Sequence, residues 1–196
     1  MESTKYIESR DFKTAVREPE TFTPANDIEI TAEQVKNLER FERVLGKEAR
    51  VAVDEENNVA AKVETNSKQV YVSLETLKRG TDDTFVAYAA KHEKTHIDNG
   101  VKGLDLKGQL SPDKIQVIER NLISNTFDAT NVLEGFTDWQ AGEHEKSGYK
   151  DLVQDAKTLD QLSKENGNGS LIDVFKEPTI QEFYDRLRLT AENLLK

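Results

Sequence analysis

The sequence has no cysteine among its 196 residues. Without cysteine the chain can form neither disulfides nor thiolate-ligated zinc sites, and it has no thiol nucleophile for catalysis. The redox compartment is not restricted by this absence, because a chain without cysteine tolerates oxidising and reducing conditions alike. Histidine is also scarce, with three in the chain, so a histidine-based metal site has to be completed by carboxylates or by the third histidine.

The chain also lacks long apolar runs and an excess of positive charge. No stretch approaches the roughly 20 apolar residues of a membrane-spanning helix, and residues 1–10 lack the apolar core of a signal peptide. The 27 basic residues are outnumbered by 37 acidic ones, which gives a formal net charge of -10. An acidic surface repels phosphate groups, so we expect a cytoplasmic protein whose partners are neither nucleic acids nor membranes.

The expected domain organisation rests on length and composition. Hydrophobic residues make up 36% of the sequence and charged residues 33%, which is typical of a folded and highly charged protein. Residues 1–26 are polar and show no periodicity, so we expect a flexible N-terminal arm there. Residues 27–196 are enough for a single domain with a sizeable core.

The apolar pattern predicts an α+β fold. Thr31 and Gln34 form a capping-box signature, and apolar residues then recur at helical spacing until Gly46, which predicts a helix at about 32–45. Three short segments rich in β-branched residues predict a small antiparallel sheet in the form of a meander: 51–53, 59–63 and 69–74. The C-terminal half is predicted to be mostly helical, with a loop at 103–108 and helices at 85–97, 111 to about 142, 149–165, 171–176 and 178–195.

Two histidines carry the clearest chemical signal in the sequence. His92 and His96 lie four residues apart in a predicted helix, so both imidazoles face the same side and can reach one metal ion. Glu93 lies about 100° further round the helix, which suits a general base beside a metal-bound water better than a third ligand. This His-Glu-x-x-His run is typical of zinc hydrolases, in which zinc lowers the pKa of its bound water to about 7.

A catalytic zinc ion has three protein ligands and one open position. Because cysteine is absent, the third ligand must be a carboxylate or the remaining histidine. Glu134 is the best candidate, since it lies in the next long helical stretch among apolar neighbours, where an unpaired carboxylate is costly. Asp138 follows four residues later on the same helical face and can orient a ligand histidine by accepting a hydrogen bond from its outer ring nitrogen.

Taken together, the runs His92-Glu93-x-x-His96 and Glu134-x-x-x-Asp138 resemble the gluzincins, the thermolysin-like zinc metallopeptidases. The short chain and its Leu-Glu-Gly-Phe-Thr-Asp segment at 133–138 are similar to the compact single-domain members called minigluzincins. The resemblance covers roughly residues 50–150. It implies a minimal zincin-like fold, one Zn²⁺ per chain held by the two histidines and Glu134, and hydrolysis of a peptide or protein substrate.

Two further roles are implied by the resemblance alone. In this family the substrate adds as an extra strand to a sheet edge. Here that edge would be the strand just before the histidine helix: Val70, Tyr71, Val72, Ser73 and Leu74. A tyrosine or a histidine also stabilises the oxyanion in such enzymes, and the candidates in this chain are Tyr149 and His144.

Three other interpretations fit the same residues. A solvent-facing helix can carry a His-Glu-x-x-His run by chance. The zinc can instead be structural, with His144 as a fourth ligand and no turnover. The enzyme can also be latent, with the N-terminal arm or the C-terminal helix in the cleft and an acidic side chain such as Glu8, Asp11 or Glu18 on the zinc. Metal content and hydrolytic activity distinguish these interpretations.

Overall fold

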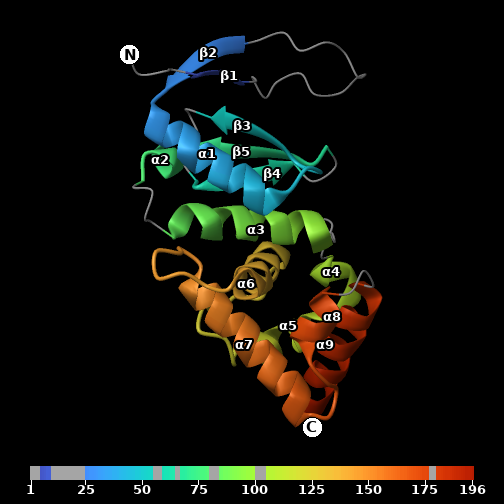
Figure 1. The fold of residues 1–196 in the computed structure, drawn as a ribbon. Coiled ribbons are helices and arrows are strands. Elements are labelled where there is room, and N and C mark those ends of the chain that lie inside the picture. Colours follow the sequence, from blue (N-terminus) through green and yellow to red (C-terminus); the bar gives the residue numbers. More distant parts are fainter. Residues whose placement is uncertain are drawn as a thin grey trace. The chain divides into compact units, whose positions relative to one another are not determined.

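The computed structural model describes residues 5–9, 25–54, 59–64, 67–79, 84–99, 105–176 and 180–196. The chain forms two compact units, 1–97 and 98–196. The single domain predicted over 27–196 stays a prediction. Within the described residues the strands belong to the first unit and the second unit is helical (Figure 1). This confirms the predicted α+β class with a mostly helical C-terminal half.

The first unit begins with a strand pair. β1 (Lys5–Ser9) pairs antiparallel with β2 (Ala25–Ile30). Both strands include residues from the predicted arm at 1–26, while residues 1–4 and 10–24 of that arm lie outside the described part of the chain. In β2 the side chains of Ile28 and Ile30 are buried and that of Glu29 between them is exposed. This two-residue alternation gives β2 the apolar face that a strand needs.

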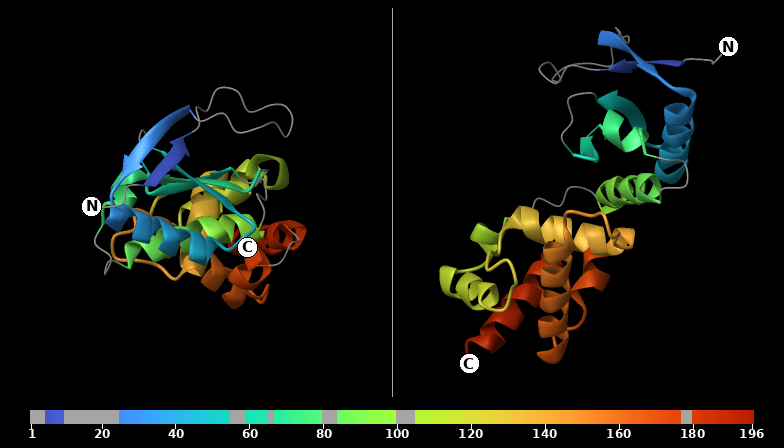
Figure 2. Two further views of the ribbon diagram at one scale, coloured as in Figure 1. Left: turned by 45° about the horizontal axis from the view of Figure 1, so that its top comes forward. Right: turned by 90° about the vertical axis from the view of Figure 1, so that its left-hand side faces the viewer.

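Helix α1 (Ala32–Leu45) has the predicted bounds and the predicted caps. The side chain of Thr31 accepts a hydrogen bond from the backbone N–H of Gln34, whose own side chain accepts one from the backbone N–H of Thr31. Gly46 follows the last turn with φ of 84°, a conformation that suits glycine because it has no Cβ. The helix lies beside one face of the three-stranded sheet described next (Figure 2).

The three-stranded sheet has the order β3-β5-β4. β3 (Arg50–Asp54) pairs parallel with β5 (Gln69–Ser73), and β4 (Ala61–Glu64) pairs antiparallel with β5. The predicted antiparallel meander is therefore wrong, because it would place β4 in the middle. All five residues of β5 are buried, and a strand buried on both faces is typical of the centre of a sheet rather than its margin. Residues 55–58 and 65–66, which connect these strands in the sequence, lie outside the described residues.

The same strand order contradicts the predicted substrate edge. Val70, Tyr71, Val72 and Ser73 lie in β5, and their backbone groups face strands on both sides. A central strand has no open edge to which another strand can add. Leu74, the last residue of the predicted edge, is the first residue of α2 (Leu74–Leu77), whose N-cap is Ser73.

Helix α3 (Phe85–Asn99) includes the whole helix predicted at 85–97 and continues for two more residues. Its buried residues include an aromatic and aliphatic set at its start, followed by His92 and Glu93. Residues 80–83, which precede this helix in the sequence, lie outside the described part of the chain. The helix therefore carries the whole His-Glu-x-x-His run in its second half.

The second unit is a group of helices around an aromatic core. The rings of Phe136, Phe175 and Phe183 lie 5.1–5.8 Å apart between centroids, and these three side chains are almost fully buried. None of the described helices is long and apolar enough to cross a membrane. The helices are α4 (Leu106–Gln109), α5 (Pro112–Glu119), α6 (Ala129–Ala141), α7 (Lys150–Glu165), α8 (Leu171–Lys176) and α9 (Ile180–Leu194).

Two predictions in this region are wrong. The predicted loop at 103–108 contains the start of α4, and the single helix predicted from 111 to about 142 is divided into α5 and α6. The division is stabilised from a distant position, because the buried Asp155 carboxylate on α7 accepts hydrogen bonds from the backbone N–H groups of Ile123 (2.6 Å) and Ser124 (3.2 Å). Asp128 then caps α6 by accepting a hydrogen bond from the backbone of Asn131.

Removing the Asp155 carboxylate is expected to destabilise the second unit. Asp155→Ala leaves two backbone donors of the α5–α6 connection without their partner, which costs about 2 kcal/mol. Urea unfolding followed by circular dichroism measures the loss. Gln154→Ala is the control, because Gln154 is the exposed neighbour of Asp155 on α7. Equal stability of the two variants would show that the connection does not depend on Asp155.

Candidate metal centre

The two predicted ligand histidines lie side by side on α3. Their Nε2 atoms are 3.1 Å apart and their ring centroids 4.8 Å apart. His92 is buried, with 6% of its surface exposed, and His96 is partly buried. Tyr88, one turn before His92, packs its ring 6.4 Å from the His92 ring. The helical repeat of 3.6 residues thus places both imidazoles on one face, as the sequence predicts.

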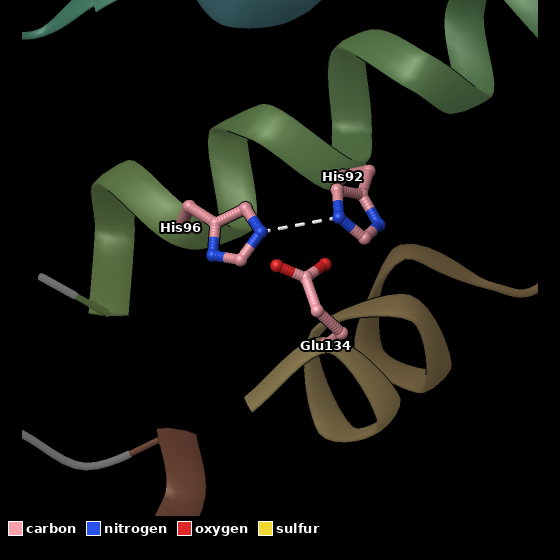
Figure 3. A group of neighbouring side chains, drawn as sticks. All are labelled: His92, His96 and Glu134. Atoms are coloured by element: carbon pink, nitrogen blue, oxygen red, sulfur yellow. Dashed lines mark hydrogen bonds between the residues drawn. The ribbon is translucent and has the colours of Figure 1, made fainter. Parts of the chain in front are cut away.

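Glu134, the predicted third ligand, joins the two histidines. One ligand atom from each of His92, His96 and Glu134 lies within 4.8 Å of the other two. Figure 3 shows the Glu134 carboxylate pointing towards the two imidazole rings. These three side chains form a group that can hold a metal ion. Among the described residues, this is the one group of at least three histidines and acidic residues whose ligand atoms lie close enough together to hold a metal ion.

The spacing of the donors suits a small divalent metal. Two imidazole nitrogens that bind one tetrahedral ion at about 2.0–2.1 Å lie about 3.3 Å apart. The observed 3.1 Å between the Nε2 atoms of His92 and His96 is within a few tenths of an ångström of that value. The donor set of two imidazoles and one carboxylate also suits such an ion. The residues present therefore fit a metal without a rearrangement of α3.

Local packing positions Glu134 on α6. The next residue, Gly135, lies against the backbone of α7, where an added Cβ would come within 2.8 Å of the Leu152 carbonyl carbon. Glycine therefore allows α6 and α7 to approach closely at this level. The side chains of Val132 and Phe136, on either side of Glu134, are buried. Together these contacts hold the α6 turn that carries the carboxylate.

Glu93, the predicted general base, follows His92 on α3 and is also buried, with 5% of its surface exposed. Burial of a carboxylate is costly unless it has polar or charged partners. Helical geometry separates the direction of its side chain from that of His92 by about 100°. Glu93 is not one of the three grouped residues. The role of Glu93 as a base stays a prediction.

Asp138 is almost fully buried, with 1% of its surface exposed. Its Oδ2 accepts a hydrogen bond of 3.0 Å from the hydroxyl of Ser147. Burial raises the pKa of Asp138 to about 6, the Ser147 hydrogen bond and nearby His144 lower it, and the charge of Glu143 raises it. The predicted role of Asp138 as the partner of a ligand histidine stays a prediction.

Because the pKa of Asp138 is raised, the free energy of unfolding is expected to depend on pH. Because the native carboxyl binds its proton more tightly than the unfolded one, whose pKa is near 3.8, the native state loses stability as the pH rises through about 4–6. Between pH 4.5 and pH 7 this loss amounts to about 2 kcal/mol. Urea unfolding of chelator-treated protein should therefore show a larger fall in stability for wild type than for Asp138→Asn. Parallel pH profiles for the two proteins would contradict the raised pKa.

The two candidate oxyanion stabilisers lie in the segment between α6 and α7. His144 is partly buried, and its Nδ1 accepts a hydrogen bond of 3.1 Å from the backbone N–H of Lys146. Tyr149 is the N-cap residue of α7 and donates its backbone N–H to the Ser147 hydroxyl. A pocket of about 360 Å³ opens beside this segment, lined by Asp138, Glu143, His144, Glu145, Lys150, Val153, Gln154 and Lys157. Nothing in these contacts tests the oxyanion role of either residue.

Sequence reasoning missed three polar residues near the predicted site. Ser147 is the hydrogen-bond partner of Asp138, and Asn99 donates a hydrogen bond to Gln140. No motif or spacing in the sequence marks these residues, because their partners come from other elements or from a turn. For Asn99 the sequence indicates only that a helix ends nearby, because Gly100 follows it.

Comparisons with protein-family models, with known proteins and with solved structures find no match for this chain. The resemblance to the gluzincins therefore rests on the residues of the two runs alone and stays a prediction. The capacity to hold a metal ion does not depend on that resemblance, because it follows from the positions of His92, His96 and Glu134.

Proposed function

We propose that this chain is a zinc-dependent peptidase of the gluzincin type. The observation that carries the proposal is the group of His92, His96 and Glu134, with ligand atoms within 4.8 Å of one another. A structural zinc site is normally closed by four side chains, whereas a catalytic site uses three and keeps one position for water or substrate. The three-residue group supports the catalytic alternative.

Zinc is the metal that these donors favour. Imidazole nitrogens and a carboxylate oxygen are common zinc ligands, and neutral imidazoles leave most of the positive charge of the ion unbalanced. When bound, zinc would supply the Lewis acidity that activates a water molecule and polarises the carbonyl of the scissile peptide bond. The roles of the protein residues then follow from their positions on α3, on α6 and in the segment after α6.

Glu93 is proposed to act as the general base and then as the general acid. Its carboxylate accepts the proton that the attacking water loses, and then delivers that proton to the nitrogen of the leaving amine. The burial of Glu93 supports this role, because few water molecules then compete with the substrate for its carboxylate. Such a residue acts on protons and need not bind the metal.

Three residues beyond the metal group are proposed to assist. Asp138 accepts a hydrogen bond from a ligand histidine and thereby holds the ring in the tautomer that binds zinc. His144 or Tyr149 donates a hydrogen bond to the oxyanion. For His144 this is supported by the Lys146 N–H bond to Nδ1, because the proton of a neutral imidazole is then on Nε2, where it can be donated.

The substrate is proposed to add to β4 in place of the strand that the sequence suggests. In the three-stranded sheet as described, β4 lies at one margin and pairs antiparallel with the central β5. A marginal strand presents backbone N–H and C=O groups along its outer side, and an extended peptide can pair with them. An extended segment of a peptide or protein is therefore the expected substrate.

The test measures metal and activity on the same sample. Elemental analysis of protein purified without added metal is expected to find about one zinc per chain. Cleavage of casein, an unstructured protein substrate, should be lost on chelation and restored by added zinc. Zinc without cleavage would favour the structural or latent alternatives, and a gain of cleavage in a variant lacking residues 1–26 would then favour the latent one. Absence of bound metal would overturn the proposed function.

A further inference from the structure

A row of aromatic rings runs along α3 and ends in the two histidines of the metal group. Its members are spaced three or four residues apart: Phe85, Tyr88, His92 and His96. This spacing places their side chains on one side of the helix. Successive ring centroids lie 5.6 Å, 6.4 Å and 4.8 Å apart. The whole row belongs to the first unit of the chain.

The first rings of the row lie in a packed environment. Phe85 and Tyr88 are buried, with 6% and 8% of their surfaces exposed. The guanidinium of Arg79 lies over the Phe85 ring, with Cζ 4.0 Å from the centroid, and the backbone carbonyl of Arg79 accepts a hydrogen bond from the buried Asn37 side chain on α1. Side chains packed in this way stay close to one conformation. The ring of Tyr88 is therefore a fixed surface for the next residue of the row.

That next residue is His92, one helical turn after Tyr88. The two rings meet at an interplanar angle of 58°, and their centroid distance is within the range of aromatic pairs. A side chain loses conformational freedom when it binds a ligand, and this loss weakens the binding. An imidazole that already packs against Tyr88 loses less of this freedom, because the contact restricts the ring before a metal arrives.

We infer that Tyr88 is a positioning residue for the metal centre, where it holds the His92 ring in the orientation that it has beside His96. The inference rests on the proposed function, because it takes His92 as a zinc ligand. The contacts that carry it lie within α3. Tyr88 touches neither the metal nor the substrate in this role, and it acts on the affinity for zinc through the His92 ring.

The experiment measures the dissociation constant of Zn²⁺ for the full chain by competition with a chromophoric chelator. Tyr88→Leu removes the ring but keeps an apolar side chain, and it is expected to weaken zinc binding roughly fivefold. Tyr88→Phe keeps the ring and should restore wild-type affinity. Phe41→Leu is the matched control, because it removes a buried ring of the same unit from α1 instead of α3, and it should leave the zinc affinity unchanged.

Nuclear magnetic resonance of the metal-free protein separates positioning from folding. The chain has three histidines, so the imidazole C–H resonances form three sets. Tyr88→Leu should shift the His92 set and leave the His144 set in place, because an aromatic ring shifts the resonances of nuclei close to it. Tyr88→Met replaces this variant if the leucine protein does not fold.

Four results would overturn the inference while leaving the proposed function intact. These are wild-type zinc affinity in Tyr88→Leu, unshifted His92 resonances in that variant, and a loss of affinity in Tyr88→Phe or in Phe41→Leu equal to that in Tyr88→Leu. Failure of the wild-type protein to bind zinc would instead overturn the proposed function and the inference with it.

Discussion

Replacing Glu93 by glutamine is expected to abolish peptide hydrolysis while one zinc ion stays bound to each chain. Glutamine has the size of glutamate and preserves the packing of this buried position, but its amide cannot accept the proton of the attacking water. Loss of a general base lowers the rate by roughly 10²–10⁴-fold. The measurement is the turnover number on casein, paired with elemental analysis of the same samples.

Variants of the grouped ligands and of an exposed residue on α3 serve as controls for Glu93→Gln. His96→Ala and Glu134→Ala each remove one of the three grouped ligands and should lose both zinc and activity. Lys91→Gln changes an exposed residue of the same helix and should retain both. Wild-type turnover in Glu93→Gln would exclude Glu93 as the base, and loss of zinc from this variant would show that Glu93 is needed to hold the metal.

The second large effect is expected at Gly135, which lies next to Glu134 on α6. An alanine Cβ at this position would meet the backbone of Leu152 on α7, within 2.8 Å of its carbonyl carbon and closer still to its oxygen. Backbone atoms cannot move aside as a flexible side chain can, so α6 and α7 must separate. Gly135→Ala should therefore lower the free energy of unfolding by about 3 kcal/mol. It should also weaken zinc binding, because Glu134 moves with its helix.

The direction of this effect is informative because alanine normally stabilises a helix by about 1 kcal/mol relative to glycine. Gly148→Ala is the matched control, since an added Cβ there meets no atom within 4 Å, and its stability should stay near that of wild type. Urea unfolding of the two variants gives the comparison. A Gly135→Ala protein as stable as wild type would show that α6 and α7 do not need their close approach.

Local features of the fold were predictable from the sequence. The capping box of Thr31 and Gln34 and the stop at Gly46 define α1, because each of these signals acts within a few residues. The same holds for the spacing of His92 and His96, since the helical repeat alone places them on one face. The bounds of β3, β4 and β5 were also predicted to within two residues, whereas β1 and β2 were not predicted as strands.

Glu134 was predictable as the third member of the metal group for a different reason. With no cysteine in the chain, few residue types can complete a site started by two histidines. A carboxylate among apolar neighbours in the next long helical stretch is then the best candidate for the third ligand, because an unpaired carboxylate is costly there. The structure brings Glu134 to the histidines as predicted, although the element that carries it is shorter than the predicted helix.

Only the tertiary structure decided how elements distant in the sequence combine. The sheet places β5 between β3 and β4, and all five residues of β5 are buried, which is typical of a central strand. The connection between α5 and α6 is hydrogen-bonded to Asp155, more than 30 residues away. By itself the sequence determined the chemistry and the local geometry of the metal ligands, because these depend on residue type and helical repeat. Strand order, helix division and the Asn99–Gln140 bond depend on contacts between distant residues, which no local pattern encodes.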